Sequence, residues 1–164
     1  MIGGLVTIGN GGTLQGGSNG IGSLTLTNGL NLQTGSTTSL LIRSTNNYTS
    51  FSILGGTVKY GGTLRLDLSQ STASAGDRFS LFSTWGNGAT NMNDFSSIVS
   101  IGKSFSFSDN NGIWTGAYGG LSYQFNIASG NLTVSTAAIP EPSTYALFGL
   151  GVLALVFAYS RKVA

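Results

Sequence analysis

Ser100 and Lys103 stand three residues apart, a spacing at which a lysine amine can activate a serine hydroxyl for acyl transfer. A Ser-Asp-Asn triplet at residues 108–110 follows them. This chemistry requires the serine and the lysine on successive turns of a helix. The segment SIVSIGKSFSFSD instead alternates like a strand, a glycine separates the pair, and no Lys-Thr-Gly motif follows. We therefore interpret the segment as an exposed strand and turn, and a hydrolase would require the two side chains to prove adjacent.

Few other residues of the types that commonly take part in catalysis or metal binding are present. The chain has no cysteine and no histidine, which excludes thiolate nucleophiles, imidazole bases and the usual zinc and copper ligands. The acidic residues are scattered, and no pair has the spacing of a sugar-cleaving acid and base or of a calcium loop. We predict a protein that is not an enzyme and that holds no catalytic residue, cofactor or metal. The acidic residues are Asp67, Asp77, Asp94, Asp109 and Glu141.

Aromatic residues accumulate in the second half of the chain. Trp85, Trp114, Tyr118 and Tyr123 could form a surface on which sugar rings stack, which would make the protein a carbohydrate-binding or adhesin module. Large aromatic side chains are also the usual content of a hydrophobic core. We favour the core and keep the sugar-binding surface as the alternative.

The chemistry that the sequence does indicate lies near its C-terminal end, in the segment Ile-Pro-Glu-Pro. Pro140 and Pro142 have no amide hydrogen, and each proline disfavours a helical conformation in the residue before it. We expect Pro140, Glu141 and Pro142 to be extended and accessible to a processing enzyme. Residues 137–142 are the predicted extended linker that carries this motif.

An apolar run follows this linker and ends on a basic pair. Ser143 can cap a helix, and the 17 residues from Ser143 to Tyr159 would span about 26 Å, slightly less than a hydrocarbon core of about 30 Å. Arg161 and Lys162 mark the cytoplasmic end, which places the body outside the cytoplasm. By length alone, a plain C-terminal membrane anchor and a buried apolar helix remain alternatives. The residues predicted for the transmembrane helix are Ser143, Tyr145, Leu147, Phe148, Leu150, Val152, Leu153, Leu155, Val156, Phe157 and Tyr159.

The order Pro-Glu-Pro, Ser-Thr, apolar run and basic pair resembles the PEP-CTERM sorting signal of Gram-negative bacteria. The resemblance implies a recognition motif at residues 140–142, a transient helical anchor, and a basic stop at Arg161 and Lys162. It further implies that a membrane transpeptidase, exosortase, is the partner that processes the tail. Members of this group are exported, surface-associated and often linked with exopolysaccharide. The expected path is an inner-membrane intermediate with a periplasmic body, then the outer surface or the extracellular matrix.

The body before this tail is predicted to be all-β. Apolar and polar residues alternate in segments such as SLTLT, TLRLDLS and LSYQFNI, and Asn-Gly and Gly-Gly pairs lie between them as turn formers. Only 7% of the residues are charged, and the chain before the tail carries five basic and four acidic residues, so nucleic-acid binding is not expected. Short strands with glycine-dense turns fit a β-solenoid or a β-sandwich, and we favour solenoid rungs.

The body segments also resemble the C-terminal part of passenger-like proteins built from autotransporter-associated β-strand repeats. The matching segments are GTLQGGSNGIGSLTLTNGLNLQTGSTTSLLI, GGTVKYGGTLRLDL, AGDRFSLFS and YQFNIASGNLTVS. We predict solenoid-like rungs over residues 1–70, an antiparallel β cap of the same domain over 71–136, and the helix with its basic tail over 143–164. The start MIGGLVTIGN shows no signal peptide, so an exported protein would need an N-terminus that precedes it.

Overall fold

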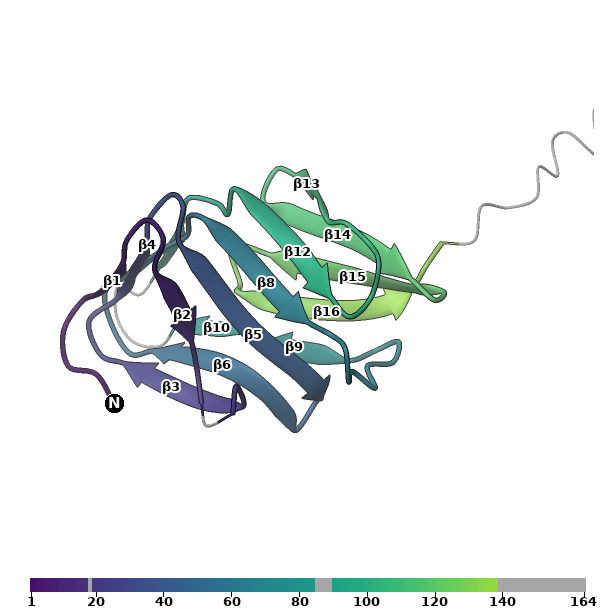
Figure 1. Cartoon of the computed structure of the whole chain (residues 1–164), viewed down its shortest axis with the longest axis horizontal. Helices are drawn as coiled ribbons and strands as arrows, with labels where there is room; N and C mark the ends of the chain where they lie inside the picture. Colours follow the sequence, from purple (N-terminus) through teal and green to yellow (C-terminus); the bar gives the residue numbers. More distant parts are fainter. Residues whose placement is uncertain (18, 85–89, 139–164) are drawn as a thin grey trace, which may run out of the picture.

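The structure is a computed structural model that describes residues 1–17, 19–84 and 90–138 (Figure 1). These residues form strands and turns without a helix, which confirms the all-β prediction for the body. Within these ranges no helix is long or apolar enough to cross a membrane. The predicted transmembrane helix lies at residues 143–164, outside the described residues.

Eleven strands pair in parallel and fall into three sets. The first set is β1 (Val6–Ile8), β4 (Leu30–Leu32), β7 (Thr57–Lys59) and β11 (Thr90–Met92). The second is β2 (Thr13–Gln15), β5 (Thr37–Ser44), β8 (Thr63–Asp67) and β12 (Ser97–Ile101). The third is β3 (Gly22–Leu26), β6 (Asn47–Ile53) and β10 (Phe82–Thr84). The last two sets join into one seven-stranded sheet because the neighbouring ends of β5 and β6 pair antiparallel.

The chain passes through these sets in the same order on successive passes, and each pass pairs in register with the next. In the second set Leu14 pairs with Thr38, Thr38 with Leu64, and Leu64 with Ile98. These four side chains are buried, so one inward-facing column runs through four passes. The alternation of apolar and polar residues therefore places the same face of every pass towards the core.

Two glycines at one corner are required by this stacking. Gly62 has a φ of +63°, and a Cβ at this position would overlap the carbonyl oxygen of Ser36 in the preceding pass. A Cβ at Gly61 would overlap the carbonyl oxygen of Leu32 in the same way. Because the backbones approach so closely, neither of these two positions has room for a side chain.

Five strands form a separate antiparallel sheet in the order β13 (Ser108–Asn110), β14 (Ile113–Tyr118), β15 (Leu121–Asn126), β16 (Asn131–Thr136) and β9 (Arg78–Ser80). Residues 71–136, where the sequence predicts an antiparallel cap, thus hold two kinds of pairing. β10, β11 and β12 lie in the same range and pair in parallel with strands of the earlier passes. The parallel passes therefore continue to Ile101, beyond the predicted limit at residue 70.

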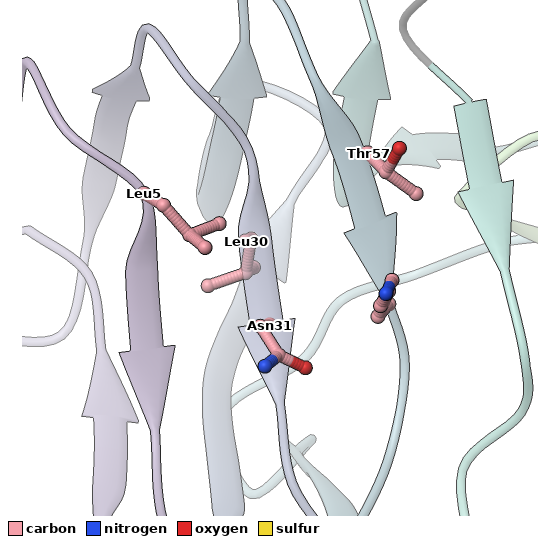
Figure 2. A pocket seen from close by; sticks show the side chains of 5 residues that line it. Leu5, Leu30, Asn31 and Thr57 are labelled. Atoms are coloured by element: carbon pink, nitrogen blue, oxygen red, sulfur yellow. The ribbon is translucent and has the colours of Figure 1, made fainter.

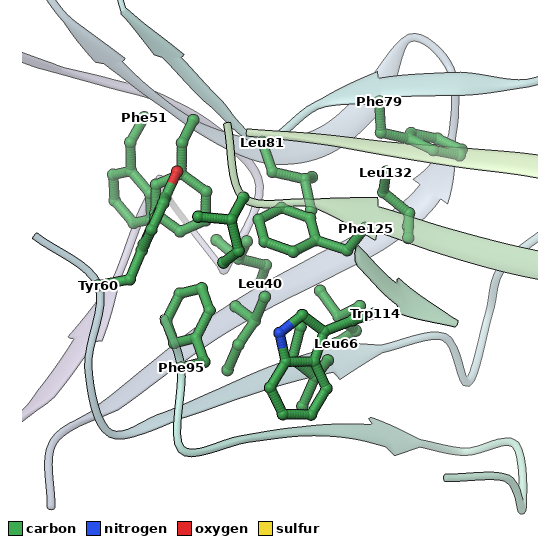
Figure 3. Packing of buried hydrophobic residues seen from close by; sticks show 14 of the residues in the cluster. Leu40, Phe51, Tyr60, Leu66, Phe79, Leu81, Phe95, Trp114, Phe125 and Leu132 are labelled. Atoms are coloured by element: carbon green, nitrogen blue, oxygen red, sulfur yellow. The ribbon is translucent and has the colours of Figure 1, made fainter. Parts of the chain in front are cut away.

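One hydrophobic core connects the parallel strands with the antiparallel sheet. Tyr60 lies between them, with ring centroids 5.1 Å from Phe82, 4.8 Å from Phe95 and 6.3 Å from Phe125 (Figure 3). A fully buried leucine or phenylalanine contributes about 1.5 to 3 kcal/mol relative to an exposed one. The antiparallel sheet thus covers apolar side chains of the last passes.

Candidate functional site

The predicted sorting segment leaves the body at the end of β16. Thr136 pairs with Leu121, and the amide of Ala137 donates a hydrogen bond of 2.8 Å to the carbonyl oxygen of Gly120. Gly120 belongs to the tight turn between β14 and β15, at the same end of the sheet (Figure 1). Ala138 is exposed, so the chain leaves the body towards solvent.

The residues predicted to carry sorting lie outside the described residues. These are the motif Pro140, Glu141 and Pro142, the helix from Ser143 to Tyr159, and the basic pair Arg161 and Lys162. Ala137 is their last described attachment to the body. The individual roles assigned to them stay predictions.

Ser100 and Lys103 lie at a turn, as expected, and their functional groups have other partners. The Ser100 hydroxyl has two acceptors at 2.6 Å, the backbone carbonyl oxygens of Lys103 and Phe105. The Lys103 ammonium donates to the phenol oxygen of Tyr123 at 3.2 Å. The hydroxyl therefore stabilises the turn after β12, and no hydrogen bond joins it to the amine.

Two of the four aromatic residues considered for sugar stacking, Trp114 and Tyr123, lie in the core. Trp114 is 8% exposed and Tyr123 is fully buried, so their rings offer no stacking face. Tyr118 is 44% exposed, and Trp85 lies outside the described residues. A sugar-stacking surface built on Trp114 and Tyr123 is therefore wrong, because both rings pack against the body.

A polar hollow, which we call the corner hollow, lies where the first and second sets of strands meet. It has a volume of about 470 Å³ and takes side chains from three successive passes. Asp94 is the acidic residue among them. Its Oδ1 accepts hydrogen bonds from the Phe95 amide at 2.6 Å and from the Trp114 indole nitrogen at 2.7 Å. The lining residues are Asn31, Leu32, Gln33, Thr34, Tyr60, Gly61, Asn93, Asp94 and Ser96.

The corner hollow is difficult to predict from the sequence. Its residues come from three separate turns, and they meet only through the register of β4, β7 and β11. Gly61-Gly62 is one of the Gly-Gly pairs predicted to form turns, and Gly62 has a φ of +63°. These residues can be recognised as one group only after the passes are aligned, because a turn made of glycine then lies between two turns that carry polar side chains.

A second hollow, smaller and more apolar, adjoins the first along β4 and β7 of the first set of strands (Figure 2). Its volume is about 230 Å³, and its lining residues are Leu5, Leu30, Asn31, Thr57 and Lys59. Leu5 is 59% exposed and Lys59 is exposed as well. Asn31 lines both hollows, so the two are neighbours.

Two further observations concern titratable groups in the described part of the chain. No group of three or more acidic residues, histidines or cysteines lies close enough together there to hold a metal ion. Burial raises the pKa of the Tyr60 phenol well above its ordinary value near 10. The Tyr60 hydroxyl finds no hydrogen-bond partner among the described residues.

Comparison with known proteins found a match in the tail. A family model described as the PEP-CTERM protein-sorting motif matches residues 138–162. The chain carries a PEP-CTERM sorting motif. The matched range contains Pro140 to Pro142, the predicted helix and the basic pair, and it begins directly after Ala137. A PEP-CTERM motif implies export, sorting to the cell envelope and processing by an exosortase. No curated protein and no solved structure matches the chain, and the resemblance of the body to passenger-like proteins stays a prediction.

Proposed function

We propose that the chain is a non-catalytic surface protein whose β body is delivered outside the cell by its PEP-CTERM tail. The observation that carries this proposal is the match at residues 138–162, placed directly after the last paired strand. In this proposal the tail is an exosortase substrate and a transient membrane anchor. The body passes from the periplasmic side of the inner membrane to the outer surface or matrix of a Gram-negative bacterium.

The position of the motif supports processing close to the folded body. Ala137 is bonded to the body, and Pro140 follows three residues later. A fully extended chain covers at most about 3.6 Å per residue, so Pro140 lies within about 11 Å of Ala137. The two prolines favour an extended backbone and hold this short connection open for an enzyme.

The tail composition supports a transient anchor with one orientation. The run from Ser143 to Tyr159 is apolar and, at 17 residues, lies at the lower end of the lengths that span a bilayer. Arg161 and Lys162 at its end favour the cytoplasmic side, because basic residues are retained there. The body would then lie on the opposite side of the membrane.

The body itself supports a structural role. Its parallel passes repeat the same three sets of strands, as the rungs of a β-solenoid do, and the antiparallel sheet would be the cap at one end. The Ser100 hydroxyl is bonded to backbone carbonyls, which gives no support to a serine nucleophile. A stacked β body of this kind would act as a spacer or adhesive element on the surface.

The test replaces Pro140, Glu141 and Pro142 by alanine in a host that contains an exosortase, with one epitope on the body and another after Ala164. The wild-type chain should lose the C-terminal epitope and reach the outer fraction. The triple variant should keep both epitopes and stay in the inner membrane, because the enzyme lacks its recognition motif. Gel mobility and cell fractionation measure both outcomes.

The matched control replaces three exposed residues of β13, Ser108, Asp109 and Asn110, by alanine. This variant should be processed and sorted like the wild type. If the Pro-Glu-Pro variant is also processed and located normally, the sorting proposal is wrong. A C-terminal epitope that stays on the wild-type protein would indicate the alternative, a plain C-terminal membrane anchor.

A further inference from the structure

We propose that the corner hollow binds the hydroxyl groups of an uncharged saccharide chain. This inference goes beyond sorting, because it assigns a ligand to the body and uses no residue of the tail. It also differs from the sugar-stacking alternative, since it depends on polar side chains of the stacked corners. The binding residues are Asn31, Gln33, Thr34, Asn93, Asp94 and Ser96.

The hollow lies at the turns of three successive passes, and the middle turn carries only glycine. Lys59 pairs with both Asn31 and Met92, so the turns that follow these three residues are neighbours. Neighbouring strands lie about 4.8 Å apart, which separates the outer two passes by about 9.6 Å. Gly61 brings no side chain into the hollow, and a Cβ there would overlap the Leu32 carbonyl oxygen.

The carboxylate of Asp94 is fixed at one side of this space. Its Oδ1 accepts the hydrogen bonds from the Phe95 amide and from the Trp114 indole. Trp114 is buried beside the core in Figure 3, so it holds the carboxylate from the inside. Oδ2 keeps its acceptor capacity, and a pre-oriented carboxylate loses little entropy when a ligand hydroxyl donates to it.

The remaining polar groups suit hydroxyls better than ions. Side-chain amides and hydroxyls each donate and accept hydrogen bonds, as sugar hydroxyls do. Among the residues that the structure describes, no lysine or arginine lines the corner hollow, which disfavours phosphate and other anions. Asp94 is the single carboxylate among these described lining residues, whereas calcium sites commonly gather several carboxylate ligands. An uncharged polyhydroxylated ligand fits this composition.

The adjoining hollow points to a chain rather than a single sugar. Asn31 lines both hollows, and the exposed side chain of Leu5 gives the second one an apolar wall (Figure 2). The apolar face of a sugar ring can pack against this aliphatic group while its hydroxyls reach Asn31 and Thr57. The volumes of about 470 and 230 Å³ together are within the usual range for ligand sites.

The test uses the full chain in a detergent without a sugar headgroup, applied to an array of neutral and uronate-containing bacterial oligosaccharides. A double variant, Gln33→Ala with Asn93→Gly, removes two amides. Glycine at position 93 keeps the left-handed backbone, where φ is +61°. Wild-type binding to neutral oligosaccharides should fall at least tenfold in this variant. The matched control is Gln124→Ala, which removes an exposed amide from the antiparallel sheet.

A second readout follows the Trp114 indole, whose nitrogen bonds Asp94. In a Trp85→Phe background, the neutral oligosaccharide that binds best should shift the Trp114 emission, and the double variant should abolish the shift. Equal binding by wild type and double variant overturns the proposal, as does binding of uronate chains alone. An array without any binding overturns it too. A shift produced by calcium chloride alone would instead indicate a cation site.

Discussion

At the scale of single residues, Tyr60 is the clearest case of conflict between packing and polarity. Its ring packs against Phe82 and Phe95 at centroid distances near 5 Å, and the side chain is 2% exposed. Its hydroxyl has no partner among the described residues. A buried hydroxyl without a hydrogen bond costs about 1 to 3 kcal/mol.

We expect Tyr60→Phe to raise the free energy of unfolding by about 1 kcal/mol, because it keeps the ring contacts and removes the unpaired hydroxyl. Urea unfolding followed by circular dichroism measures this. The control is Tyr118→Phe, at a residue that is 44% exposed, which should change the stability by less than about 0.5 kcal/mol. A loss of stability in Tyr60→Phe would show that the hydroxyl is hydrogen-bonded in the native protein.

The same residue predicts a dependence on alkaline pH. Burial raises the pKa of the folded Tyr60, whereas the unfolded chain releases this proton near pH 10. The neutral phenol therefore favours the folded state fully below pH 10, and stability falls as the pH rises above it, by up to about 1.4 kcal/mol per pH unit. Urea unfolding between pH 9 and 11.5 should show a shallower decline for Tyr60→Phe than for wild type. Equal slopes would contradict a buried, neutral Tyr60.

At the scale of elements, close stacking of the corners makes Gly62 a sensitive position. Alanine there adopts an unfavourable left-handed backbone and also meets the Ser36 carbonyl oxygen. We expect Gly62→Ala to lower the free energy of unfolding by about 3 kcal/mol or more. The matched control is Gly119→Ala, where φ is +60° and a Cβ would meet nothing within 4 Å. It should cost only about 1 to 2 kcal/mol, and equal losses in chemical denaturation would exclude a stacking effect.

The strands and turns also show which features of the fold can be predicted from the sequence. Alternation in TLRLD and LSYQFN predicted strands, and both are strands in the structure, with Leu64, Leu66 and Phe125 fully buried. The Asn111-Gly112 turn was predicted and has positive φ at both residues. Such signals are local, so a single stretch of chain carries them.

The pairing partners of the strands could not be predicted from such local signals. β11 is three residues long and exposed at both ends, so it has no alternation to detect. Its parallel pairing with β7 depends on chain more than thirty positions away. The predicted limit of the rungs at residue 70 excluded β10 to β12, which pair in parallel with strands of earlier passes. The corner hollow was missed for the same reason, since it exists only after the passes are in register.

At the scale of the whole molecule, body and tail differ in how they encode function. The tail is a linear motif whose residues are consecutive in the sequence, so the sequence alone predicted it and the match at residues 138–162 agrees. The body places its candidate ligand groups by three-dimensional stacking.

Because the body and the tail are separate in this sense, we predict that the body folds without the tail but not without its last strand, β16. A chain that ends after Ala138 keeps β16 and its pairing with β15 and β9, so its thermal midpoint should equal that of the full chain. A chain that ends after Gly130 loses β16 and the buried side chains of Leu132 and Val134. Truncating buried aliphatic side chains costs about 2 to 5 kcal/mol each, much of the 5 to 15 kcal/mol that a domain has. Circular dichroism melts should therefore show cooperative unfolding for the first chain and none for the second. A lowered midpoint in the chain ending at Ala138 would mean that the tail also stabilises the body.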